Sequence, residues 1–307
     1  MKIRRRAWSL AVCAFLALAS SINEAAAQDL EPRAYSASPI GTHFVAVGWA
    51  RSTGDVLVDS AAPVQDITAT TNLATIGGGT TFDFFGRTAI LLAAFPYAWA
   101  TASGQVGEET RSVSRSGLGD PRIKFSVNFI GGRALKRSEF ALAERPTIVG
   151  ASLAMAPPLG QYDPTKLVNL GANRWAFRPE VGISHAIRKW TIDGYAGVWL
   201  FTTNNEYYTG NSVRTQDPIY AFQGHASYTF KPRLWAAFDA TWYSGGAAIV
   251  NGNDSGDLQR NSRIGATLSL PLTVRQSIKT SVTKGATTRV GADFTTLSVA
   301  WQVSWFD

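Results

Sequence analysis

The last residues before the terminal aspartate constrain the fold most strongly. The segment LSVAWQVSWF, residues 297–306, alternates between apolar and small polar side chains with a period of two. One face carries Leu297, Val299, Trp301, Val303 and Trp305, and the other carries Thr296, Ser298, Ala300, Gln302 and Ser304. A β-strand places successive side chains on opposite faces. An apolar face that ends in tryptophan suits lipid and a polar face suits a lumen, so the segment predicts the closing strand of a transmembrane β-barrel.

The N-terminus predicts a secretory signal. Lys2 and three arginines precede an apolar run from Trp8 to Ala19, and Ala25–Ala27 offer small residues for cleavage before Gln28. The run is shorter than the roughly 20 residues of a membrane helix. We therefore expect a cleaved signal peptide at residues 1–27, a periplasmic lead-in at 28–41 and an outer-membrane barrel at 42–307.

Removal of the signal changes what the composition implies. The one cysteine, Cys13, lies in the apolar run and would leave with it, which excludes disulfides and thiolate metal sites. Four of the 29 basic and one of the 22 acidic residues leave as well, so 25 and 21 remain, a net charge of +4. We expect no nucleic-acid partner from so small an excess. Three scattered histidines argue against a zinc site, and no cofactor is expected.

The rest of the chain has no apolar run long enough for a membrane helix and little helical periodicity. Alternation predicts twelve strands, roughly at residues 42–51, 67–84, 88–103, 120–130, 145–156, 174–184, 190–203, 219–230, 234–244, 259–272, 276–283 and 294–306. Short turns such as FFGR, IRK and KPR alternate with longer loops such as GQVGEETRSVSRSG and NNEYYTGNSVRTQDP. The fold class predicted is all-β, a transmembrane antiparallel up-and-down barrel with short periplasmic turns and long extracellular loops. A periplasmic β-sandwich fits less well because the strands are long.

Several segments together resemble one known family. GLGDPRIKFSVN, APPLGQYDP, NLGANRWAFRPEVG and LQRNSRIGATLSLPL, in this order, are similar to the outer-membrane family named for the meta-pathway of phenol degradation. The resemblance covers nearly the whole chain after the signal. It implies an outer-membrane β-barrel described as a transporter and often linked to uptake of aromatic compounds, and it carries over no catalytic or binding residue.

Seven charged residues are expected to face the lumen: Asp120, Arg122, Lys124, Arg178, Glu180, Asp239 and Arg263. An Arg or Lys that faced lipid at the membrane midplane would cost about 2–4 kcal/mol. In one interpretation these groups form a constriction that selects polar or anionic solutes in a channel for passive uptake of small molecules. In the other they pair and fill the bore of a plugged, structural barrel, because barrels of about eight strands are filled and open pores have about 16–18.

Four tyrosines near the long loops are candidates to line a route for aromatic or hydrophobic molecules: Tyr162, Tyr207, Tyr208 and Tyr243. The C-terminal residues Trp301, Val303, Trp305 and Phe306 resemble the signal that the outer-membrane barrel assembly machinery reads, although Asp307 follows it. The expected partners are therefore this machinery, outer-membrane lipid, lipopolysaccharide and a small-molecule solute, and the expected location is the outer membrane of a Gram-negative bacterium.

Lipid hydrolysis is an alternative function. His225 and Ser227 lie two residues apart on one strand face, and Asp239 on the next strand points to the same side. These are the residue types that an activated serine needs. Outer-membrane phospholipase A also has His and Ser two apart on a strand of a twelve-stranded barrel, but that pair faces lipid. Because alternation puts His225 and Ser227 in the lumen, we predict that the chain is not an enzyme.

Overall fold

The computed structural model describes residues 30–58, 64–107 and 109–307. The predicted signal peptide, residues 1–27, lies outside these ranges. In the described part of the chain, no helix is long and apolar enough to cross a membrane.

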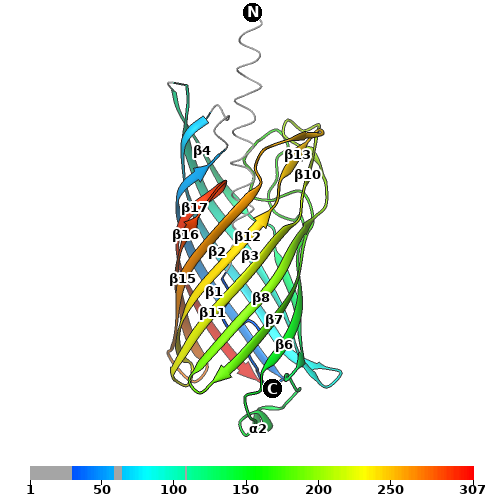
Figure 1. Ribbon diagram of the computed structural model, residues 1–307, viewed down its shortest axis with the longest axis vertical. Coiled ribbons are helices and arrows are strands. Elements are labelled where there is room, and N and C mark those ends of the chain that lie inside the picture. Colours follow the sequence, from blue (N-terminus) through cyan, green and yellow to red (C-terminus); the bar gives the residue numbers. More distant parts are fainter. Residues whose placement is uncertain (1–29, 59–63, 108) are drawn as a thin grey trace, which may run out of the picture.

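Twelve strands form one closed antiparallel barrel (Figure 1). In order around the barrel they are β1 (Thr42–Leu57), β2 (Val64–Phe84), β3 (Arg87–Val106), β5 (Arg122–Ile130), β6 (Ile148–Ala156), β7 (Ala176–Ile187), β8 (Trp190–Phe201), β11 (Ile219–Lys231), β12 (Leu234–Gly245), β15 (Gln259–Pro271), β16 (Gln276–Thr287) and β17 (Gly291–Phe306). β17 pairs with β1 along the full length of both strands. The predicted fold class is confirmed, and the terminal segment is the strand that closes the barrel.

Alternation decides which side chains face lipid. On β1, Val45, Val47 and Trp49 point outward and are 43%, 48% and 39% exposed. Their partners on β17 are Val303, Trp301 and Val299, so the apolar faces of the two strands form one continuous surface. The residues between them point into the barrel. This arrangement satisfies the backbone polar groups by strand pairing and places a band of apolar side chains against lipid.

One part of the wall differs from the sequence prediction. Residues 104–117, predicted to be a polar loop, form the end of β3 and an additional strand, β4 (Glu109–Leu118), which pairs with β3. Strand structure is then interrupted at Gly119–Pro121 before β5 begins. The prediction was wrong because the outward face of β4 carries hydroxyl side chains at every position before Leu118, namely Thr110, Ser112, Ser114 and Ser116. Cross-strand pairs such as Thr101 with Ser114, 3.0 Å apart, lie on this polar part of the outer wall.

The connections differ at the two rims. Four short strands at the long-loop rim form a separate sheet: β9 (Asn204–Tyr207), β10 (Ser212–Gln216), β13 (Ala248–Val250) and β14 (Asn253–Asp254). At the other rim lie the short turns, the helix α2 (Arg137–Phe140) and the C-terminus (Figure 1). Long loops at one rim and short turns at the other are therefore confirmed, and the connection that contains α2 is the longer exception.

Candidate functional site

Residues 30–41, here termed the inner segment, lie inside the barrel. Three of its side chains, Glu31, Arg33 and Tyr35, contact inward-facing residues of strands from β5 round to β12. The sequence predicts a periplasmic lead-in for residues 28–41, but the described part of this stretch occupies the lumen instead. The contacts join residues 93 to 196 positions apart in the chain, so local sequence patterns gave no sign of them.

Tyr35 anchors the inner segment in a notch of the wall. The ring is 1% exposed and meets the ring of Tyr195 edge-on at 5.2 Å between centroids. Gly150 and Gly182, which pair across β6 and β7, form the notch. A Cβ at Gly182 would lie 2.3 Å from Tyr35 Cε2, and one at Gly150 would lie 2.5 Å from Tyr35 Cδ1. Only glycine at these two positions leaves room for the ring.

Three of the predicted lumen charges meet beside this notch. Lys124 Nζ lies 2.7 Å from a carboxylate oxygen of Glu31 and 3.9 Å from one of Glu180. Arg178 donates to the other oxygen of Glu180. The Tyr35 hydroxyl donates to Glu180 at 3.0 Å, so the cluster joins the inner segment to the wall. Buried charges of this kind are tolerated because each has an opposite charge or a hydrogen bond.

Arg33 holds the opposite side of the inner segment. Its guanidinium donates to Ser227 Oγ at 2.8 Å and Thr229 Oγ1 at 2.7 Å, and lies 4.6 Å from the centroid of the Trp235 ring. Its backbone N–H donates to the Asp193 carboxylate at 3.3 Å. Asp193 and Tyr195 are lumen residues that the sequence analysis missed. Alternation within residues 190–203 could have found them, because both have the parity opposite to Ile192 and Leu200.

His225 and Asp239 are brought together, but not with Ser227. His225 Nδ1 lies 2.7 Å from Asp239 Oδ1, and Thr267 donates to the other carboxylate oxygen at 2.7 Å. His225 Nε2 lies 3.2 Å from Gln223 Oε1. The Ser227 hydroxyl accepts from Arg33 and donates to the Thr191 carbonyl at 3.4 Å. The base therefore contacts an orienting carboxylate, while the serine hydrogen-bonds to other groups, which is not the geometry of an activated nucleophile.

The other predicted lumen charges have separate positions. Asp120 lies at the break between β4 and β5, where its carboxylate accepts from the N–H groups of Gly160 and Ala172, each at 2.8 Å. Arg263 is buried and donates to the Phe294 carbonyl at 2.8 Å and Thr283 Oγ1 at 3.1 Å. Arg122 is half-buried on the inward face of β5, opposite Ala94. The seven charges thus do not form one ring.

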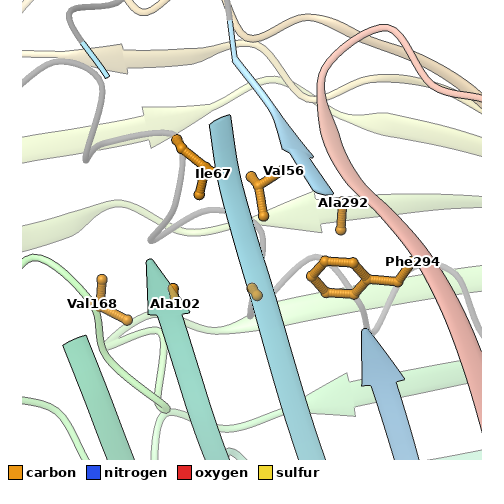
Figure 2. Close-up of a cluster of buried hydrophobic side chains, with 7 residues drawn as sticks. Val56, Ile67, Ala102, Val168, Ala292 and Phe294 are labelled. Carbon is orange, nitrogen blue, oxygen red and sulfur yellow. The ribbon is translucent and has the colours of Figure 1, made fainter. Parts of the chain in front are cut away.

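The loop of residues 157–173 folds into the long-loop end of the barrel. Asp120 fixes both of its ends, and Arg115 Nε donates to the Val168 carbonyl at 3.1 Å. Leu170 packs on Ala98 and Ala100 of β3. Val168 belongs to a cluster of inward-facing apolar side chains, here termed the apolar cluster, with Val56, Ile67, Ala69, Ala102, Ala292 and Phe294 (Figure 2). The loop therefore places apolar side chains across this end of the lumen.

The inner wall below the apolar cluster is lined mainly by small side chains, with Leu73 of β2 as a larger one among them. We term this surface the small-residue wall: Ala46, Gly48, Ala50 and Ser52 of β1, Thr71, Thr75 and Gly77 of β2, Ala94 of β3, Ser281 of β16, and Thr296, Ser298 and Ala300 of β17. All of them are only half-buried. By contrast, the inward residues of β11 from Ile219 to Ser227 are buried, with Arg33 of the inner segment bonded to Ser227. The accessible part of the lumen therefore runs along the small-residue wall.

The four candidate tyrosines do not form one lining. Tyr162 accepts from Asn204 Nδ2 at 3.0 Å and donates to the Glu206 carbonyl at 2.9 Å. Tyr207 is 5% exposed under the Arg214 guanidinium, and burial raises the pKa of its phenol to about 12. Tyr208 is half-buried next to it. Tyr243 is buried inside the barrel, against Trp199 and Ile219.

The C-terminal residues divide between the two faces of β17. Trp301 and Trp305 are 44% and 41% exposed on the outer face, together with Val303. Phe306 points the other way, and the Arg137 guanidinium lies 4.5 Å from its ring centroid. Asp307 lies 2.8 Å from His43 Nε2. Trp305 is thus in phase with the lipid-facing residues.

Comparison with known proteins places this fold in context. An outer-membrane channel from Pseudomonas putida F1 superimposes with a TM-score of 0.75 at 18% identity, over 90% of this chain and 100% of that one. The transport unit of the autotransporter AIDA-I from Escherichia coli gives a TM-score of 0.55 at 11% identity, over 96% and 97%. At these identities the similarity shows the fold alone. Among curated proteins, no sequence matches the chain. A family model does match, over residues 50–302, so this barrel belongs to the family described as "Putative MetA-pathway of phenol degradation".

Proposed function

We propose that the protein is an outer-membrane channel for passive uptake of small aromatic or hydrophobic molecules. This proposal rests on the order in which two surfaces follow one another along the lumen. The apolar cluster lies at the long-loop end, and the small-residue wall continues below it. Hydrophobic constrictions in channels hinder ions and water by dewetting. An aromatic solute would pass such a constriction without the penalty that a strongly hydrated solute incurs when it loses water.

The proposed setting is the outer membrane of a Gram-negative bacterium. Residues 1–27 would direct export and then be removed. The assembly machinery would read Trp301, Val303, Trp305 and Phe306 of the closing strand. Lipid and lipopolysaccharide would contact the exposed apolar faces of β1 and β17. Membership in the family supports this setting.

Current recordings in planar bilayers test the function. Small, discrete currents are expected from the folded protein, since the inner segment and the loop of residues 157–173 both narrow the lumen. An uncharged aromatic solute should interrupt this current, and a sugar at the same concentration should not. In a Phe294→Ser variant the interruptions should shorten, because the apolar cluster loses its largest side chain.

Two outcomes would support the alternatives. A folded protein with neither conductance nor solute-dependent liposome swelling would indicate a plugged, structural barrel. Phospholipid turnover that is lost in a Ser227→Ala variant would indicate a hydrolase.

A further inference from the structure

Lys279 occupies a distinctive position on the inner wall. On β16 it pairs with Ala300 of β17 and Ser269 of β15, both of which face inward. Its neighbour Ile278 pairs with the lipid-facing Trp301, so the parity of β16 directs Lys279 into the lumen. Lys279 is the one charged residue on an inward face within five described ranges of the surrounding strands, namely 46–52, 71–79, 88–102, 276–283 and 296–302. Lys279 therefore lies at the edge of the small-residue wall.

The ammonium group of Lys279 is accessible from the lumen. The residue is exposed, unlike its inward-facing neighbour Ser269, which is buried. Lys279 is within electrostatic reach of Glu31. However, the Glu31 carboxylate lies 2.7 Å from Lys124, and none of the described acidic residues has a carboxylate within 4.0 Å of Lys279. The positive charge thus faces the accessible part of the lumen without a contact ion pair.

Four charges on the opposite side of the lumen form two contact pairs. Lys124 bonds to Glu31, and Arg178 bonds to Glu180. The electric fields of two opposite charges in contact largely cancel at a distance of several ångströms from the pair. A single exposed charge in a narrow, low-dielectric lumen acts over a longer range than the same charge in bulk water. Lys279 therefore adds an exposed positive charge to the field along the small-residue wall, on the side away from these pairs.

We propose that Lys279 makes this channel selective for anions and favours small aromatic anions over aromatic cations. This inference rests on the proposed channel function and specifies its charge preference. The aromatic ring would suit the apolar cluster, and the negative group would be attracted by the Lys279 ammonium. Charged side chains at constrictions set ion selectivity in other channels by the same physics.

Reversal potentials across a planar bilayer with a KCl gradient test the proposal. The wild type should be selective for chloride. Lys279→Gln should move the reversal potential toward zero, and Lys279→Glu should change its sign. Lys284→Glu is the matched control, because Lys284 is exposed on the outer face of the same strand and undergoes the same change in charge. That control should leave the reversal potential unchanged.

A second measurement uses organic ions of similar size. Benzenesulfonate should permeate faster than trimethylphenylammonium through the wild type, and Lys279→Glu should reverse this order. Conductance with the same reversal potential in wild type, Lys279→Gln and Lys279→Glu would overturn the role of Lys279 and leave the channel function intact. A folded wild type without any conductance would overturn the channel function, and the inference with it.

Discussion

At the scale of single residues, the fit of Tyr35 between two glycines holds the inner segment in the lumen. The ring is buried against Tyr195, and its hydroxyl reaches both Ser152 and Glu180 at 3.0 Å. Burial of an aromatic side chain stabilises a structure by about 3–5 kcal/mol relative to alanine. Displacement of this one ring should therefore release the segment.

Gly182→Val is expected to displace the inner segment and raise the single-channel conductance. The new Cβ would lie 2.3 Å from Tyr35 Cε2, a distance that requires the ring to leave its notch. Gly194→Val is the matched control on the neighbouring strand. A Cβ there points outward and meets only Ile183 Cγ2, at 3.7 Å. Equal conductance in wild type and Gly182→Val would contradict the role of the notch.

At the scale of elements, the loop of residues 157–173 is held in the barrel chiefly by Asp120. Hydrogen bonds to a charged group contribute about 1.5–3 kcal/mol each, and this carboxylate accepts two from the loop backbone. Asp120→Ala should therefore undock the loop, and trypsin should cleave after Lys166 faster than in wild type. Asp254→Ala serves as the control, because Asp254 caps only a local turn through the Gly256 N–H. An unchanged cleavage rate in Asp120→Ala would show that other contacts hold the loop.

Elements that face lipid were readily predicted, and those that face water or the lumen were not. The strands β1, β11 and β17 follow from alternation because the bilayer requires apolar side chains on every second residue. β4 has hydroxyl groups on its outer face and therefore has no such pattern. The parity of the strands also placed Lys124, Glu180 and Asp239 in the lumen. The partners of Lys124 and Glu180 on the inner segment could not be predicted, because Glu31 and Tyr35 reach them through tertiary contacts alone.

At the scale of the whole molecule, the closing strand completes the barrel. β17 pairs with β1 as far as Thr42 and Phe306, and Arg137 and His43 contact its last residues. Deletion of Trp305–Asp307 should abolish membrane assembly, because it shortens the closing pair and removes the terminal aromatic residues. The loss of heat-modifiable migration in gels would show this. Deletion of Asp307 alone should leave assembly intact, and normal folding of the longer truncation would contradict the role of this segment.

The central claim is that solutes cross the barrel along the small-residue wall. The conductance of a variant in which that wall is obstructed tests it most directly. Gly48 lies on that wall, and a Cβ there makes ordinary contacts with Ala300, the nearest at 3.5 Å, so a large side chain can extend into the lumen. Gly224→Trp is the matched control, since a Cβ there meets nothing within 4 Å and points to lipid. Gly48→Trp should lower the single-channel conductance several-fold, while Gly224→Trp should leave it unchanged. Equal conductance in the two variants and the wild type would contradict a path along this wall.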